Sequence, residues 1–143
     1  MKVQFAQTKS EIEKIIDLRY EILRKPWDQP KDTATDGLEK VAHNAFILND
    51  TGKMIACGRL HENENKIGQI RYMAVDNGEQ GKGLGKLILK ALEDKAKEIN
   101  LNTIELQARE NALEFYKNNN YELKEKSFLL WGIIQHYLMV KIL

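Results

Sequence analysis

The 143 residues are 43% hydrophobic and 30% charged, a balance typical of one packed domain and unlike that of a disordered chain, so residues 1–143 are expected to form a single fold. Twenty-two Lys and Arg against 21 Asp and Glu give a net charge of +1, which provides no overall field to favour nucleic acid or an anionic membrane as a partner. No apolar stretch approaches the roughly 20 residues that cross a bilayer, no signal-peptide pattern opens the chain, and Cys57 is the only cysteine, so we expect a cytoplasmic protein without disulfides or a cysteine-based zinc site.

A short strand, a helix and a long loop are predicted at the start of the chain. Val3-Gln4-Phe5 can form an edge strand. Ser10-Glu11-Ile12-Glu13 fits a capping box, and apolar residues at helical spacing follow it, so a helix is expected from Glu11 to Arg24. Residues 25–37 combine Pro, Asp, Thr and Gly, which indicates an irregular surface segment that Trp27 docks onto the core.

Three strands of an antiparallel meander are predicted next, followed by the most strongly patterned helix of the chain. Residues 42–48 and 53–60 are strand-like and enclose the turn residues Asn49-Asp50-Thr51-Gly52, which predicts a hairpin. A third strand is expected at 66–75. After a glycine-rich turn, apolar residues on one face and charged residues elsewhere predict a helix over residues 84–99.

The remainder of the chain predicts a strand, a short helix and two further strands. Thr103 to Ala108 alternates in polarity, and Asn111 is expected to cap a short helix that carries Tyr116. Strands are expected at 121–123 and 134–142. This order of elements indicates an α+β or mixed α/β domain with a largely antiparallel sheet.

The glycine-dense turn Gln80-Gly81-Lys82-Gly83-Leu84-Gly85-Lys86 joins the third meander strand to the strong helix. Glycine lets the backbone approach a ligand closely and adopt positive φ, and the first N–H groups of a helix have no intrahelical acceptor. Together with the charges of Lys82 and Lys86, these groups would form a cradle suited to a phosphate or pyrophosphate.

Two common phosphate-binding motifs do not match this turn. A Walker A loop requires Ser or Thr after its lysine, whereas Leu87 follows Lys86. The dinucleotide fingerprint would begin at Gly81 and would require glycine where Lys86 stands, and no βαβαβ pattern surrounds it.

Residues 80–85 instead match Q/R-x-x-G-x-G/A, the acyl-CoA pyrophosphate motif of the GNAT-type N-acetyltransferase superfamily, at the strand-to-helix position where that superfamily carries it. Asn111 to Lys117 is similar to the family's N-x-x-A-x-x-[F/Y]-Y-type helix. The chain therefore resembles this superfamily, most clearly from Lys53 to Leu143. The resemblance implies a central, mostly antiparallel sheet of six to seven strands with its fourth and fifth strands splayed apart, and three to four helices.

The resemblance also implies acetyl-CoA as the cofactor. The main chain of Met73 and Val75 would pair with the pantetheine arm, the N–H groups of Gln80 to Lys86 would bind the pyrophosphate, and the thioester would lie near Asn111. A bulge in the fourth strand would open the slot between the fourth and fifth strands. The implied reaction is direct attack of a primary amine on the thioester through a tetrahedral intermediate. The three histidines lack metal-ligand spacing, so no metal is expected.

Two residues are the candidates for proton transfer. Tyr116 stands at the family position of the tyrosine that protonates the departing sulfur, so the resemblance implies a general acid there. His136, on the last strand, has an ordinary pKa near 6.5 and is the preferred general base, ahead of His61, Glu62 and Glu105. A core aromatic and a half-exposed strand histidine are the structural alternatives for Tyr116 and His136.

The acceptor is expected to be an unidentified small-molecule or peptide amine. Residues 19–33 resemble the region that lines the acceptor entrance in the family. Phe128 and Trp131 are candidates for a homodimer contact or for core packing. Two other functions fit the same glycine turn: a non-catalytic acyl-CoA sensor, and a module that binds another phosphate ligand.

Overall fold

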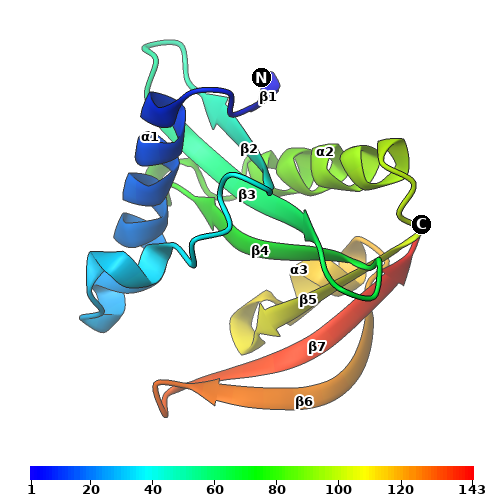
Figure 1. The fold of residues 1–143 in the computed structure, drawn as a ribbon. Coiled ribbons are helices and arrows are strands. Elements are labelled where there is room, and N and C mark those ends of the chain that lie inside the picture. Colours follow the sequence, from blue (N-terminus) through cyan, green and yellow to red (C-terminus); the bar gives the residue numbers. More distant parts are fainter.

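Seven strands form one sheet, in the spatial order β1-β2-β3-β4-β5-β7-β6, in the computed structural model, which describes residues 1–143 (Figure 1). The strands are β1 (Val3–Phe5), β2 (His43–Leu48), β3 (Met54–Glu62), β4 (Gly68–Val75), β5 (Thr103–Arg109), β6 (Glu122–Leu130) and β7 (Ile134–Ile142). The helices are α1 (Lys9–Arg19), α2 (Leu84–Glu98) and α3 (Leu113–Asn118). A π-helical turn, η1 (Tyr20–Arg24), continues α1, and shorter 3-10 turns are η2 (Lys25–Trp27), η3 (Lys31–Ala34), η4 (Asn77–Glu79) and η5 (Glu110–Ala112).

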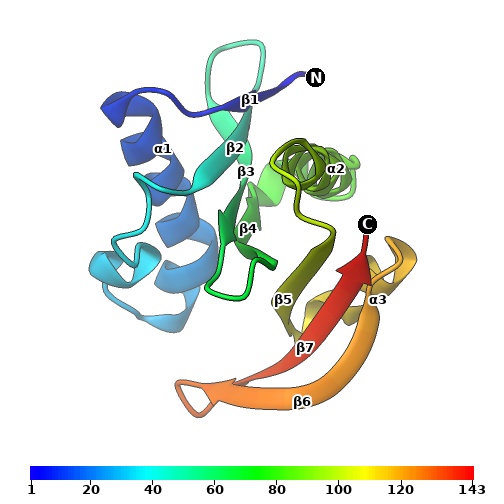
Figure 2. The ribbon, with the colours of Figure 1, turned by 45° about the vertical axis from the view of Figure 1, so that its right-hand side comes forward.

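Neighbouring strands are antiparallel throughout the sheet except for β4 and β5, which run parallel. Helix α1 covers one face of the sheet, and α2 and α3 cover the other (Figure 2). The predicted mixed α+β class, the mostly antiparallel sheet and the three helices are thereby confirmed. No helix combines the length and apolarity that a membrane span requires.

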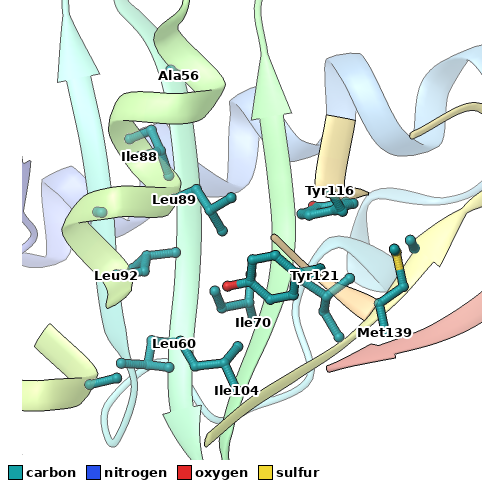
Figure 3. Close-up of a cluster of buried hydrophobic side chains, with 14 of the residues drawn as sticks. Ala56, Leu60, Ile70, Ile88, Leu89, Leu92, Ile104, Tyr116, Tyr121 and Met139 are labelled. Carbon is teal, nitrogen blue, oxygen red and sulfur yellow. The ribbon is translucent and has the colours of Figure 1, made fainter. Parts of the chain in front are cut away.

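The larger hydrophobic core lies between the sheet and helices α2 and α3 (Figure 3). Ile88, Leu89 and Leu92 of α2 are at most 1% exposed and pack over β3 and β4, as the helical spacing of apolar residues predicts. In β5, Ile104, Leu106 and Ala108 point into this core. Because side chains alternate along a strand, Gln107 and Arg109 point to the α1 face.

The first helix begins earlier than its predicted capping box. Thr8, and not Ser10, is the N-cap: its Oγ1 accepts a hydrogen bond from the Glu11 N–H at 3.1 Å, and the Glu11 carboxylate accepts from the Thr8 N–H at 3.0 Å. The same Glu11 completes the box because it lies three residues after Thr8. Regular α-helix ends at Arg19, and the predicted stretch to Arg24 is a π turn.

Trp27 does not dock the 25–37 segment onto the core, because it is 36% exposed. Buried arginines hold the segment instead. Arg19 Nη1 donates to the Ala34 carbonyl at 3.0 Å, and Arg24 Nε donates to the Thr33 carbonyl at 3.1 Å. Ala34 is fully buried beneath them.

Two predictions in the last third of the chain were wrong. Asn111 does not cap α3: the N-cap is Ala112, without a side-chain hydrogen bond, and Asn111 lies in the preceding turn η5. The strand predicted at 121–123 is the nine-residue β6, Glu122–Leu130. It lies at the edge of the sheet with nearly every residue exposed, so its sequence shows no alternation of apolar and polar positions.

Candidate functional site

A β-bulge interrupts the pairing of β3 with β4. Cys57 pairs with Ala74 and Arg59 with Arg71, so Gly58 faces two residues of β4. Tyr72, at the bulge, has φ of +59°, an uncommon conformation for a tyrosine. Gly58 permits the bulge, since a Cβ there would lie 2.5 Å from Met73 Sδ. The bulge predicted for the fourth strand is confirmed.

Beyond this bulge, β4 and β5 separate. Their parallel pairing covers only Gly68–Ile70 against Ile104–Leu106. On the side of β5, the edge of β4 from Tyr72 to Val75 therefore has no strand partner. A cavity of about 750 Å³ lies here, within the range usual for ligand pockets. Met73, Asn111 and Tyr116 line it on the side of α2 and α3, and Arg24 and His136 on the side of α1. The predicted splayed strands therefore border a passage between the two faces of the sheet.

The glycine turn opens toward solvent at the start of α2. Gly81 and Gly83 have φ of +80° and +81°, and nothing lies within 4 Å of a Cβ built on either residue. The first intrahelical bond is from Leu87 N–H to the Gly83 carbonyl, and no side chain caps the helix. Residues 84–86 thus present main-chain N–H groups without an intrahelical acceptor, which suits an anion.

Side chains around this turn have separate tasks. Gln80 Nε2 donates to the Val75 carbonyl at 3.1 Å and holds the turn against β4. Leu84 is 4% exposed and belongs to the core, so only its main chain faces outward. A Cβ on Gly85 would lie 3.3 Å from Phe115 of α3, so glycine allows the two helices to pack closely here.

The two lysines of the turn differ in their ion pairs. Lys82 is paired with Glu79 at 2.9 Å, and Lys86 forms no ion pair. The positive charge expected of both lysines is therefore partly neutralised at Lys82.

Tyr116 is buried in α3 yet lines the cavity, so it belongs to the core and to the candidate site at once. Its ring packs edge-to-face against Tyr121, with the centroids 5.7 Å apart (Figure 3). Tyr121 donates a hydrogen bond to Glu93 at 2.7 Å, whereas the Tyr116 hydroxyl has no partner in the protein. Burial raises the pKa of Tyr116, so its hydroxyl keeps its proton at neutral pH.

His136 approaches the cavity from the α1 face. It pairs with Arg109 across β5 and β7, stacks on Phe128 with the ring centroids 4.4 Å apart, and is 6% exposed. Its Nδ1 lies 3.0 Å from the Ile134 carbonyl oxygen. If Nδ1 carries the proton of the neutral ring, Nε2 is free to accept one. Burial, together with the charge of Arg109, lowers the pKa of His136, which favours the neutral ring.

The other candidates for a general base are less well placed. His61 lines the cavity, but its Nδ1 is buried without a hydrogen-bond partner. Glu105 accepts a hydrogen bond from Asn63 at 3.2 Å and does not line the cavity, and neither does Glu62.

Four arginines gather around Tyr72: Arg19 and Arg24 belong to the segment 19–33 expected at the acceptor entrance, whereas Arg59 and Arg71 were not singled out from the sequence. The guanidinium carbons of Arg19, Arg71, Arg59 and Arg24 lie 4.2, 4.5, 5.0 and 5.6 Å from its ring centroid. Arg19 and Arg59 are fully buried, and Arg59 interrupts the apolar run from Met54 to Leu60 in β3, which is the signal that the sequence offered for it. These charges require acidic partners.

Asp36 and Glu39 supply the carboxylates for three of these arginines. Asp36 accepts from both terminal nitrogens of Arg59, at 2.6 and 2.7 Å, and from Arg71 at 2.9 Å. Glu39 accepts from Arg19 at 3.0 Å and from Arg59 at 3.1 Å. The Arg59 hydrogen bonds hold the pKa of Asp36 well below its ordinary value. Arg24 has no carboxylate partner.

Comparison with known proteins agrees with this architecture. Residues 12–121 match the sequence model of the acetyltransferase (GNAT) family. Over 142 residues, 99% of each chain, the sequence is 29% identical to an uncharacterized N-acetyltransferase, YjcF, of Bacillus subtilis (strain 168). An acyl-CoA N-acyltransferase from Pseudomonas aeruginosa has a similar fold, with a TM-score of 0.84 at 20% identity over 98% of this chain and 97% of that one. So does an aminoglycoside 6'-N-acetyltransferase complexed with coenzyme A, with a TM-score of 0.81 at 12% identity over 99% and 97%.

Proposed function

Because the chain belongs to the acetyltransferase (GNAT) family, whose members use acetyl-CoA, we propose that it transfers the acetyl group of acetyl-CoA to a primary amine of a small molecule or peptide. The observation that carries this proposal is the exposed glycine turn at the start of α2, next to the cavity between β4 and β5. The glycine turn suits the diphosphate of the coenzyme, and the cavity between β4 and β5 suits its narrow pantetheine chain.

The residues of the turn suit the coenzyme. The unpaired N–H groups of residues 84–86, with Gly81 and Gly83 leaving the backbone open, would hold the pyrophosphate, and Lys86 would add charge. The edge of β4 at Met73 and Val75, which has no strand partner on the β5 side and where Gln80 engages only the Val75 carbonyl, would pair with the pantetheine arm. Asn111 would lie beside the thioester. When bound, acetyl-CoA supplies an activated acetyl group that is open to direct attack by the amine.

Tyr116 and His136 are the residues that we assign to proton transfer. The Tyr116 hydroxyl would protonate the leaving sulfur, because a tyrosine is protonated at neutral pH, this one lines the cavity, and no acceptor in the protein competes for its hydrogen. His136 Nε2 would accept the proton of the incoming amine, since an alkylammonium with a pKa near 10.4 must lose a proton before it can attack. The two residues line the same cavity from opposite sides of the passage, so the acid would reach the sulfur and the base the amine without competing for one position.

Binding and turnover test the proposal together. Isothermal calorimetry should detect acetyl-CoA binding, and thiol release should depend on an added amine. Gly83→Glu should abolish both, because its carboxylate would repel the pyrophosphate. Gly52→Glu is the matched control: Gly52 has φ of +84° and equally open surroundings, but lies in the β2–β3 turn. Wild-type protein that ignores acetyl-CoA would refute the proposal, and binding without acetyl transfer to any amine would leave a non-catalytic sensor.

A further inference from the structure

Arg24 and Arg109 converge on one main-chain oxygen. Arg24 Nη1 and Arg109 Nη2 donate to the Leu23 carbonyl at 3.1 and 3.0 Å. A carbonyl is neutral, so it orients the two guanidinium groups without balancing their charge. Neither arginine forms an ion pair with any carboxylate of the chain. The fold therefore holds two like charges together at the wall of the cavity.

No carboxylate balances these charges, although aromatic rings lie beside Arg24: its guanidinium carbon is 5.2 Å from the Trp131 ring centroid and 5.6 Å from that of Tyr72. The cavity is lined by three arginines and a single carboxylate, Asp36, which is already shared by Arg59 and Arg71. Arg24 is 6% exposed, and a charge so far removed from water is costly without a partner. Burial lowers the pKa of Arg24, and burial together with the charge of Arg24 lowers the pKa of Arg109 to about 10. Both shifts have the direction expected of a site that lacks its counter-ion.

Donors remain free on both side chains. Arg24 Nη2 and Arg109 Nε and Nη1 have no acceptor in the protein, and none of the three is sealed from solvent. Planar guanidinium groups bind the paired oxygens of a carboxylate or phosphate. This arrangement faces the α1 side of the sheet, beside His136, whereas the glycine turn starts α2 on the other side. The arginine pair is therefore separate from the proposed pyrophosphate site.

We propose that the acceptor amine carries an anionic group, a carboxylate or a phosphate, which Arg24 and Arg109 bind while the amine lies beside His136. This inference rests on the proposed acetyl transfer. It excludes polycations such as polyamines and aminoglycosides as the preferred acceptors, because a second or third positive charge would meet the arginines.

Matched amine pairs test the charge requirement. Each pair differs by the acid group: phenylalanine with phenethylamine, leucine with isopentylamine, and phosphoethanolamine with ethanolamine. The aromatic pair suits a cavity lined by Trp27 and Phe128. We expect the anionic member of at least one pair to have a kcat/KM at least about tenfold higher, and the carboxylate and phosphate pairs distinguish the two sources of charge.

Variants assign the preference to the arginines. Arg24→Gln and Arg109→Gln should each reduce the ratio of kcat/KM between the members of the preferred pair, mainly by raising KM for the anionic amine. Arg24→Lys keeps the charge without the planar fork and should reduce the ratio less. Lys25→Gln is the control. It also removes a positive charge, one residue after Arg24, but Lys25 is exposed and is paired with Glu21.

Calorimetry with acetyl-CoA separates the two possible failures. If the protein does not bind acetyl-CoA, the acetyltransferase function fails and this inference fails with it. If acetyl-CoA binds but no amine with an acid group is bound or acetylated better than its partner without that group, the inference is wrong while the coenzyme assignment stands. An unchanged ratio in Arg24→Gln and Arg109→Gln would equally overturn the assignment to these residues.

Discussion

Asp36 accepts two hydrogen bonds from the fully buried guanidinium of Arg59, at 2.6 and 2.7 Å, and so fastens the loop before β2 to the centre of β3. The same carboxylate reaches Arg71 on β4. Asp36 therefore attaches the loop before β2, which lines the cavity, to β3 and β4, the two strands that form the bulge.

Asp36→Asn should destabilise the fold strongly. The substitution leaves the buried charge of Arg59 with only Glu39 as an ionic partner, and breaking a buried ion pair costs about 3–5 kcal/mol, here reduced to about 2–4 because Glu39 remains. Urea denaturation would measure the change in the free energy of unfolding. Asp17→Asn, which removes an exposed pair with Lys31, should cost less than about 1 kcal/mol. Equal effects of the two substitutions would contradict the role of Asp36.

Asp36 should also make stability depend on pH in the acid range. Its Arg59 hydrogen bonds lower its folded-state pKa below the unfolded value of about 3.9, so the unfolded chain binds the proton more readily. The stabilising contribution is complete above the unfolded pKa and is lost as pH falls through the folded pKa. Urea midpoints measured from about pH 6 to about pH 3 should therefore decline in the wild type and decline less in Asp36→Asn.

Tyr116→Phe should lower kcat while leaving acetyl-CoA affinity and stability almost unchanged. The lost hydroxyl has no hydrogen bond in the protein, and removal of a general acid typically costs about 10²-fold or more. Tyr121→Phe offers the opposite pattern, because its hydroxyl bonds Glu93: we expect a loss of about 1 kcal/mol in stability and an unchanged kcat. A wild-type kcat in Tyr116→Phe would show that Tyr116 is not the general acid.

The pH–rate profile should report His136. Only the neutral imidazole accepts a proton, so kcat/KM should rise with pH through the pKa of His136 and level off above it. Burial places that pKa below the ordinary value of about 6.5, so the plateau should be reached by neutral pH. His136→Gln should lower the plateau and remove this acidic limb, whereas His43→Gln, outside the cavity, should change neither. An unaltered limb in His136→Gln would assign the base elsewhere.

Gly58→Ala should disturb the bulge. The added Cβ would lie 2.5 Å from Met73 Sδ and 2.6 Å from Ile88 Cγ2, and overpacking of this kind costs about 1–3 kcal/mol. Thermal and urea denaturation would measure it. Gly78→Ala should be nearly neutral, because its Cβ would meet only Asp76 Oδ2 at 3.7 Å and the backbone conformation there suits any residue.

Local sequence patterns determined the parts of this protein whose physics is local. The apolar stripe of α2, the Asn49 turn and the glycines at 81 and 83 each follow from the preferences of a few consecutive residues. The family resemblance added the splayed strands and the coenzyme. The cytoplasmic location and the homodimer stay predictions, and Phe128, suggested for a subunit contact, stacks on His136 at the cavity.

The tertiary structure alone decided what depends on residues far apart in the chain. The family resemblance implied a bulge in the fourth strand, but only the structure placed it at Tyr72, opposite Gly58 of β3. The length of β6 likewise follows from its pairing with β7 rather than from its own pattern. Arg24 and Arg109 meet at the Leu23 carbonyl, 86 residues from Arg109. No short-range preference encodes that meeting, since packing of the whole sheet against η1 creates it, and with it the charge that we assign to acceptor recognition.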